Sequence, residues 1–409
     1  MKIAFTTLGC KLNYAETSTY ERGFRAAGFE VVTWRSKADL YLVNTCSVTA
    51  TADQKSRSLI RKLHRVNPSA KIIVTGCSAE LRRAEIEAIE GVWKVFGCKE
   101  KAQVVPECLK GLGLRAEEVP GNAVFGAYST GERTRSFLKV QDGCDNFCKY
   151  CTVPYARGGS RNIPVCECVR MAREIAAQDV KEIVLTGVNT GDYGRTTGES
   201  FLCLLKALNE VEGIERYRIS SIEPNLLSAE IIDWIASGTK FQPHFHIPLQ
   251  TGSDRLLEAM GRHYDTAFFA NKLAYIRRVM GSGVFFGIDV MVGLPGETPE
   301  LFEETVAFLK RIRPAFIHVF PYSRRPGTPA ASMPGQVDEE EKKRRVAVLE
   351  ELCARLHEEF VRSQKGTRVK VLFESKEKDG TMGGYSGNYI RVSRPFDPAL
   401  SGRIVEVEL

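Results

Sequence analysis

The sequence predicts an α/β protein of three successive units: an N-terminal parallel sheet domain, a partial (β/α)6 barrel and a small C-terminal β domain. Two observations lead to this fold class. Short apolar runs alternate with helical patterns up to about residue 335, as parallel sheets require. β-type alternation without helices appears only in the tail that follows. We place the boundaries at 1–125, 126–335, 336–365 for a linking helix, and 366–409.

The N-terminal unit contains five candidate strands. They lie at residues 3–7, 30–34, 41–44, 71–75 and 92–97. A helix is expected from about Tyr14 to Ala27, and a second long helix precedes the fourth strand. A parallel sheet built this way brings the carboxyl ends of its strands to one edge. The glycine-containing stretch around residues 111–131 is expected to link this unit to the next.

The second unit contains six candidate strands with helical patterns in every gap. They lie at 137–141, 182–187, 216–222, 244–250, 285–293 and 316–322. Six strand–helix repeats predict an incomplete parallel barrel. A charged helix over 338–364 follows, and the tail shows strand patterns at 369–373 and 389–392 with glycine-rich turns over 380–387.

Composition narrows the class of protein. A hydrophobic fraction of 43% and a charged fraction of 26% are those of a globular domain, and no apolar stretch is long enough for a membrane span. The first residues lack a signal-peptide pattern, so we expect a cytoplasmic protein. The net charge of +7 permits a polyanionic partner. Twelve cysteines in a reducing compartment indicate metal ligation or catalysis rather than disulfides.

Three cysteines form a CxxxCxxC run directly after the first barrel strand: Cys144, Cys148 and Cys151. Three thiolates on one loop can bind three irons of a [4Fe–4S] cluster and leave the fourth iron open for a chelating ligand. Zinc could use the same spacing, but a closed zinc site needs a fourth ligand and no histidine lies nearby in sequence. The mouth of a parallel barrel, where active sites are built, favours the cluster.

This run resembles the signature of the radical S-adenosylmethionine superfamily. The resemblance implies that the open iron chelates S-adenosylmethionine and that cleavage of S-adenosylmethionine gives a 5′-deoxyadenosyl radical. It also implies that Tyr150 packs near the adenine of the cofactor. The alternative for Tyr150 is an ordinary aromatic residue of the core. Three N-terminal segments and one beyond the loop extend the resemblance to the methylthiotransferase family over essentially the whole chain. They are residues 7–13 (TLGCKLN), 44–48 (NTCSV), 75–77 (TGC) and 153–158 (VPYARG).

A second site follows from the sheet alone. Cys10, Cys46 and Cys77 each follow a predicted strand by a few residues, so the three thiols should meet at one edge and bind a second cluster. The resemblance implies the same: an auxiliary [4Fe–4S] cluster that handles the transferred sulfur. We expect the remaining cysteines to be structural or incidental, although Cys98 also follows a strand. They are Cys98, Cys108, Cys166, Cys168, Cys203 and Cys353.

Polar residues at successive barrel strand ends are candidates for S-adenosylmethionine contacts. They are Asn189, Asp192, Glu223, Gln250 and Ser253. For the substrate, Arg57, Arg61 and Arg65 share one helix face in a segment without acidic residues, which suits either phosphate contact or an ordinary solvated face. Arg157 and Arg161 lie just beyond the cysteine loop and are further candidates. The tail resembles a TRAM domain, which is linked to RNA binding, but it is short and nearly neutral.

Local residues distinguish the branches of the methylthiotransferase family. Lys11-Leu12-Asn13 after the first cysteine, with Glu16, resembles the branch that acts on N6-threonylcarbamoyladenosine beside the anticodon (position 37) of tRNA. N6-isopentenyladenosine in tRNA, and an aspartate of a ribosomal protein, are the substrates of the alternative branches. A non-enzyme alternative is an iron–sulfur regulator that binds RNA. Such a protein would need no polar barrel mouth beside an open iron.

The resemblance implies a mechanism and its partners. One S-adenosylmethionine supplies a methyl group to sulfur at the auxiliary cluster, and another supplies the radical that abstracts hydrogen from C2 of the adenine. The base must leave its loop stack to reach a pocket between the first two domains. An electron donor protein must deliver the reducing electron. We expect a monomer, because the third domain already supplies substrate contacts.

Overall fold

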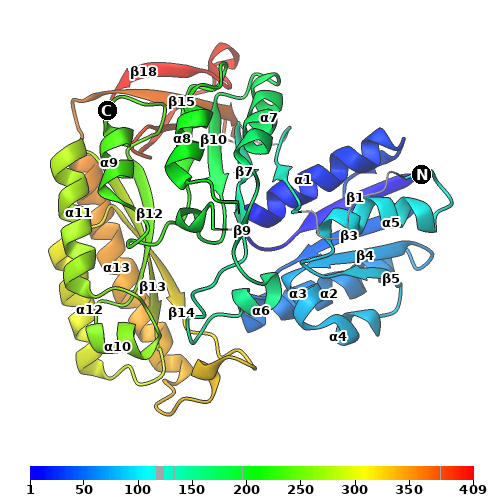
Figure 1. Ribbon diagram of the computed structural model, residues 1–409, viewed down its shortest axis with the longest axis horizontal. Coiled ribbons are helices and arrows are strands. Elements are labelled where there is room, and N and C mark those ends of the chain that lie inside the picture. Colours follow the sequence, from blue (N-terminus) through cyan, green and yellow to red (C-terminus); the bar gives the residue numbers. More distant parts are fainter. Residues whose placement is uncertain (117–123, 132–133, 196, 378) are drawn as a thin grey trace.

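The computed structural model describes residues 1–116, 124–131, 134–195, 197–377 and 379–409. It confirms the α/β class: a parallel sheet domain, a partial barrel and a C-terminal β unit follow one another along the chain (Figure 1). Within these ranges, every helix falls short of the length or the apolar character that crossing a membrane requires.

The N-terminal sheet has five parallel strands in the order β2-β1-β3-β4-β5. Their bounds are β1 Lys2–Thr7, β2 Glu30–Val32, β3 Leu40–Thr45, β4 Lys71–Gly76 and β5 Val92–Phe96. The helices are α1 Lys11–Ala26, α2 Ala50–Val66, α3 Cys77–Leu81, α4 Arg83–Glu87, η1 Lys101–Gln103 and α5 Val104–Gly111. Apolar cores cover both faces of the sheet. Helix α1 begins earlier than predicted because Cys10 is its N-cap residue.

The barrel contains six parallel strands in chain order, in agreement with the predicted partial (β/α)6 form. They are β7 Arg135–Lys139, β10 Glu182–Thr186, β11 Arg216–Ile219, β12 His244–Gln250, β13 Phe285–Val292 and β14 Phe316–Pro321. The first three and the last three form separate sheets, joined by single bridges between Tyr217 and Phe241 and between Ser221 and His246. The sequence did not predict β6 Ala127–Tyr128, which runs antiparallel to β7, or the short pair β8 Gln141–Asp142 and β9 Arg161–Asn162.

Helices that share the barrel core cover its outside. They are α7 Val165–Ala176, α8 Phe201–Asn209, α9 Ala229–Ala236, α10 Asp254–Ala259, α11 Thr266–Met280 and α12 Pro299–Ile312. The short helices α6 Val153–Arg157, η2 Thr190–Asp192 and η3 Pro329–Ala331 belong to segments that follow strand ends, and α6 contacts α3. On β12, Phe245, Ile247 and Leu249 pack in the core between strands and helices. Because side chains alternate along a strand, His244 and His246 point into the barrel. We call this inner space, which β7 and β10–β14 enclose, the lumen.

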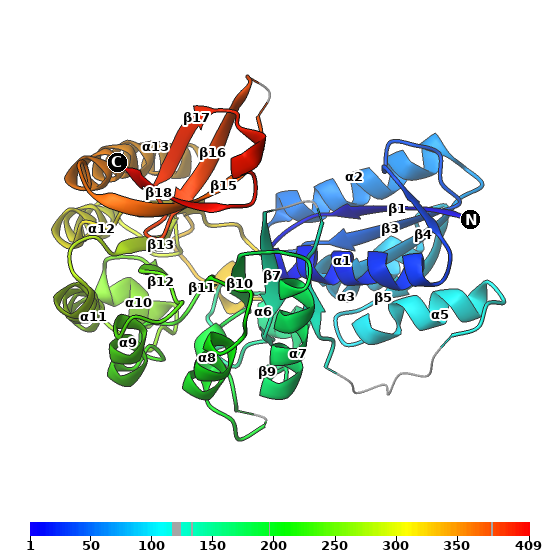
Figure 2. The same cartoon turned by 90° about the horizontal axis from the view of Figure 1, so that it is seen from above.

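The linking helix α13 Glu339–Ser363 leads to an antiparallel sheet of order β17-β16-β15-β18. Its members are β15 Arg368–Lys376, β16 Thr381–Ser386, β17 Arg391–Pro395, η4 Pro398–Leu400 and β18 Ile404–Glu408. The predicted turns over 380–387 are in fact mostly strand β16. Its glycines permit close packing: a Cβ on Gly384 would lie 2.6 Å from Val371 Cγ1. The unit lies over the amino ends of the barrel strands (Figure 2).

Candidate active site

The loop that carries Cys144, Cys148 and Cys151 lies at the carboxyl end of the barrel strands and is fixed by backbone contacts. The Cys144 amide donates to Gly158 O over 3.1 Å, and the Lys149 amide donates to Met260 O over 3.0 Å. Gly143 has a left-handed φ of 75°, and a Cβ there would lie 2.0 Å from Gly159 O, so only glycine fits. The loop is therefore held from both sides before any ligand binds.

The chemistry of these three thiols suits an iron–sulfur cluster. Burial raises the pKa of Cys144 to about 11 and that of Cys151 to about 12, and the charge of Cys148 adds to both shifts. Such thiols stay protonated until metal displaces the proton. Around one zinc ion, sulfurs must lie roughly 3.8 Å apart. Among the described residues, neither predicted cysteine triad forms a group with all ligand atoms within 4.8 Å, so the spacing fits a cluster better than one ion.

Arg262 reaches the loop from the segment after α10, and no motif in the sequence predicts this contact. Its Nη1 lies 3.1 Å from Cys148 Sγ and 3.4 Å from the Tyr150 hydroxyl. Its Nη2 donates to Glu223 and, over 2.7 Å, to the Tyr264 hydroxyl. The guanidinium therefore places a positive charge beside a thiolate ligand and orients the carboxylate of Glu223.

The second triad lies at the carboxyl edge of the N-terminal sheet. Cys10 follows β1, Cys46 follows β3, and Cys77 follows β4 directly. Burial raises the pKa of Cys46 to about 11, and the charges of Cys77 and Cys10 also act on it. Gly76 makes the approach possible, because a Cβ there would lie 2.4 Å from Thr45 O. Thus the structure gathers the three thiols as parallel strand ends should.

Comparison with known proteins gives matches over the whole chain. Residues 2–97 match Uncharacterized protein family UPF0004, and residues 138–309 match the Radical SAM superfamily. The chain is 39% identical to Threonylcarbamoyladenosine tRNA methylthiotransferase MtaB of Bacillus subtilis, over 100% of this chain and 93% of the relative. It is 36% identical to the MtaB protein of Aquifex aeolicus, over 96% and 97% of the two chains. The chain belongs to the MtaB methylthiotransferase family.

More distant relatives agree with the fold. The tRNA-2-methylthio-N(6)-dimethylallyladenosine synthase of Alkaliphilus oremlandii is 31% identical over 100% of this chain and 90% of its own. Among solved structures, the radical S-adenosylmethionine methyltransferase TsrM of Kitasatospora setae has a TM-score of 0.59 at 15% identity. The match covers 81% of this chain and 77% of that one. At this identity the likeness shows the fold alone.

The other predicted cofactor residues of this MtaB-family chain lie at the same end of the barrel. Asn189 Oδ1 accepts from the Glu223 amide over 3.4 Å, and Asp192 lies 3.3 Å from Arg195. Gln250 has a left-handed φ of 74° at a bulge in β12. Ser253 precedes α10, and its buried Oγ has no hydrogen-bond partner among the described residues. A polar ligand at the barrel mouth could supply the missing hydrogen bond to the Ser253 hydroxyl. The strained backbone of Gln250 is a second feature typical of a ligand-binding site.

Arg157 lies between the first two domains rather than on the surface. Its Nη2 donates to Asn13 Oδ1 over 2.7 Å and its Nη1 to Asp142 Oδ1 over 2.8 Å. Both groups are buried. The expected contact of Arg157 with a substrate phosphate does not fit this position. Arg161 is more accessible, but one of its nitrogens donates to Arg157 O over 2.6 Å.

Glu16 is the centre of the buried network around Arg157. It accepts from Lys101 and Lys139 over 2.7 and 2.9 Å, and it lies 3.4 Å from Arg157. Burial alone would raise the pKa of Glu16, but the three cations hold it at about 2. This network joins α1 to the barrel just behind both cysteine triads.

Two further observations revise the sequence-based view. Cys98, expected to be structural, packs against Cys77. Its thiol donates to the Cys77 sulfur, which lowers the pKa of Cys77 to about 6. On α2, Arg61 is exposed as a phosphate contact would require, whereas Arg57 is partly buried and lies 3.6 Å from Glu85. Only part of the predicted basic face of α2 is therefore free to contact a phosphate.

Several exposed apolar side chains lie on the segments that carry the cysteine triads, or on β14, whose end is followed by residues that contact the segment after Cys46. Five of the eight large hydrophobic residues that the described structure exposes belong to segments beside the cysteines. They are Tyr14, Val48, Phe147, Tyr155 and Phe320, which we call the apolar rim. Within it the Phe147 and Tyr155 rings pack edge to face, with centroids 6.0 Å apart. Exposed aromatic rings of this kind are stacking surfaces for unpaired bases.

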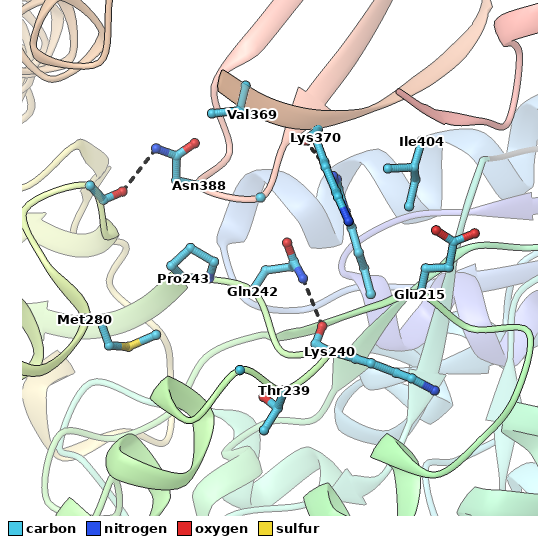
Figure 3. A pocket seen from close by; sticks show the side chains of 14 residues that line it. Glu215, Thr239, Lys240, Gln242, Pro243, Met280, Val369, Lys370, Asn388 and Ile404 are labelled. Carbon is cyan, nitrogen blue, oxygen red and sulfur yellow. Dashed lines mark hydrogen bonds between the residues drawn. The ribbon is translucent and has the colours of Figure 1, made fainter. Parts of the chain in front are cut away.

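A hollow of about 500 Å³ lies at the opposite end of the barrel, between its strand starts and the C-terminal unit (Figure 3). Lys370 of β15 and Asn388 line it from one side, and Lys240, Gln242 and Met280 from the other. None of the cysteines lines it. This hollow is therefore separate from the candidate active site.

Proposed function

We propose that this chain methylthiolates C2 of N6-threonylcarbamoyladenosine at position 37 of tRNA. The observation that carries the proposal is the pair of cysteine triads, one on each side of the contact between the first two domains, in a chain 39% identical to an MtaB protein over its whole length. Two [4Fe–4S] clusters and S-adenosylmethionine are the cofactors. When bound, they supply the radical, the transferred sulfur and the methyl group.

The residues of the chain have distinct tasks in this reaction. Cys144, Cys148 and Cys151 bind the cluster that receives S-adenosylmethionine, and Cys10, Cys46 and Cys77 bind the auxiliary cluster. The strand-end residues at the barrel mouth orient S-adenosylmethionine, with Glu223 itself held by Arg262. The buried network around Glu16 and Arg157 fixes the distance between the two triads. Rigid spacing matters because radical transfer requires the target carbon to lie within contact distance.

RNA reaches this centre over the apolar rim. Its aromatic rings stack on bases next to the one that reacts, and exposed cations such as Arg61 contact the backbone. The C-terminal unit, which resembles a TRAM domain, contributes further RNA contacts. The chain works as a cytoplasmic monomer that receives electrons from a donor protein.

Mass spectrometry of tRNA nucleosides from cells with and without the gene tests the proposal. Loss of 2-methylthio-N6-threonylcarbamoyladenosine, with recovery of its unthiolated precursor, is the expected result. Loss of the isopentenyl derivative instead would assign the chain to that substrate. If both nucleosides persist in the deletion strain and the purified, reconstituted chain fails to modify the RNA, the proposal is wrong.

A further inference from the structure

The barrel lumen contains a polar cluster that has no role in cluster binding or in the proposed contacts with S-adenosylmethionine. His246 on β12, Asp289 on β13 and His318 on β14 all point inward. His246 Nε2 lies 2.7 Å from Asp289 Oδ1, and the rings of His246 and His318 stack with centroids 4.9 Å apart. One ligand atom from each of the three residues lies within 4.8 Å of the others. We call these three residues the lumen cluster.

Solvent reaches the lumen cluster, so the space beside it is not filled by side chains. The side chains of His246 and Asp289 keep 19% and 18% of their exposure. Parallel barrels usually fill their interior with layers of branched apolar residues. A hydrated polar interior gives up that stabilisation, and buried polar groups without partners cost free energy. Among the described residues, two such orphans are His244 Nδ1 on β12 and Ser220 Oγ directly after β11.

The lumen is closed at the end that faces away from the cysteines. Tyr389 of the C-terminal unit inserts there: its ring lies 4.6 Å from that of His244 and 5.6 Å from that of Phe285. The guanidinium of Arg218 packs over the same ring at 4.9 Å and donates to Gly387 O over 2.7 Å. The lumen is therefore a cup that opens toward the candidate active site.

Lys11 brings a positive charge to this cup from the N-terminal domain. It follows Cys10 directly, and after burial the charges that act most on its ammonium are those of Tyr389, Arg135, Asp289 and Arg218, which line the lumen. Solvent nevertheless reaches the side chain. Among the described residues, no carboxylate lies within salt-bridge distance of Lys11. A solvent-exposed lysine beside the cup can pair with an anionic ligand.

Relatives of this chain differ in the N6 substituent that their names give. MtaB proteins are named for threonylcarbamoyladenosine, and another group of relatives for dimethylallyladenosine. The first substituent carries a carboxylate, a hydroxyl and a urea group, whereas the second is a hydrocarbon. A hydrocarbon would leave the polar groups of the cup unpaired, and such a mismatch is costly.

We propose that the cup binds the carboxylate-bearing N6 substituent of the target adenosine, with Lys11 pairing the carboxylate and the lumen cluster accepting and donating hydrogen bonds to its hydroxyl and urea groups. This inference rests on the proposed function. It places the adenine at the mouth, between Cys10 and the loop of Cys148, while its substituent extends past Lys11 toward Asp289. Specificity then comes from matching polar groups rather than from size.

Two RNA stem-loops that differ in one group test the assignment. One carries N6-threonylcarbamoyladenosine, and the other carries the same substituent with its carboxylate converted to a neutral carboxamide. The reconstituted native chain should prefer the carboxylate RNA in kcat/KM by about tenfold or more, the usual value of a hydrogen bond to a charged group. Lys11→Met should remove this preference. Lys206→Met, an exposed lysine on α8, is the matched control and should retain it.

His318→Phe tests the cup independently of the cysteines. It should weaken binding of the threonylcarbamoyl RNA while iron content and cleavage of S-adenosylmethionine without RNA stay unchanged. Retained preference in Lys11→Met together with unchanged binding in His318→Phe would overturn the inference. So would zinc or manganese that copurifies with the native chain and is lost in His318→Phe, because the cluster would then be a metal site. If the native chain modifies neither RNA, the proposed function fails instead.

Discussion

Arg262 Nη1 lies 3.1 Å from Cys148 Sγ, which links the segment after α10 to the cysteine loop across 114 residues of sequence. The same guanidinium also contacts Tyr150 and Glu223. It therefore connects one proposed cluster ligand with two proposed S-adenosylmethionine contacts. A positive charge hydrogen-bonded to a thiolate stabilises the more reduced, more negative cluster.

Replacing Arg262 should therefore change the electronic properties of the loop cluster. We expect Arg262→Met to lower the reduction potential of this cluster and to slow cleavage of S-adenosylmethionine at least tenfold, because the charge and the orientation of Glu223 are both lost. Arg262→Lys should restore part of the potential, but less of the rate, since lysine cannot bridge both partners. Potentiometric titration followed by electron paramagnetic resonance measures the first quantity. An unchanged potential in Arg262→Met would contradict this role.

The two cysteine triads should be separable by mutation. Cys144→Ala should abolish release of 5′-deoxyadenosine, because the cluster that receives S-adenosylmethionine loses a ligand. Cys46→Ala should spare that release and block thiolation of RNA. Each variant should bind about four fewer iron atoms per chain than the native protein. Thiolated product from the Cys46 variant would refute the two-cluster assignment, and Cys166→Ala, an exposed thiol outside both triads, is the control.

The buried carboxylate of Glu16 makes stability depend on pH. Its pKa is about 2 in the folded chain and 4.5 ordinarily, so the unfolded state binds the proton more tightly. The stabilisation is complete above pH 4.5 and is lost as the pH falls toward 2. Glu16→Gln removes the carboxylate that pairs with Lys101 and leaves Lys139 and Arg157 paired with Asp142. It should lower the free energy of unfolding at pH 7 by about 3–5 kcal/mol.

Denaturant unfolding at several pH values measures this effect of Glu16. The difference between the native chain and Glu16→Gln should shrink as the pH falls from 5 to 3. Glu21→Gln on the same helix is the control, because its ion pair with Arg25 is exposed and should contribute less than about 1 kcal/mol. A difference that stays constant with pH would show that Glu16 acts through packing alone.

The apolar rim should affect RNA binding without affecting the cofactor. Phe147 has a left-handed φ of 46°, which asparagine tolerates well, so Phe147→Asn removes the ring without straining the loop. We expect its affinity for an anticodon stem-loop to fall by about 1–3 kcal/mol, the value of one stacked base. Fluorescence anisotropy measures the change. Phe268→Asn removes an exposed ring from α11 and should have no effect.

Sequence reasoning was most successful where function follows from strand order. Cys10, Cys46 and Cys77 could be predicted to converge because parallel strands end at one edge, whatever the packing around them. Arg262 and the lumen cluster could not be predicted. Their partners come from strands and loops tens of residues apart, and only the closed packing of the barrel brings them together.

The partners of charged residues were also not predictable from the sequence. Arg157 follows the cysteine loop as a substrate contact should, yet it folds inward onto Asp142 and Asn13. Composition reveals a positive charge but not its partners. In the tail, the glycines of β16 suggested turns, whereas they permit close packing of neighbouring strands. Both errors concern tertiary contacts, which local patterns do not contain.

The insertion of Tyr389 into the barrel makes the barrel depend on a separate part of the chain. Its ring packs on His244 and Phe285 of the barrel strands, and the guanidinium of Arg218 covers the same ring. Loss of the C-terminal unit would therefore expose these side chains to water, so the unit serves the barrel as a structural cap whatever else it contacts.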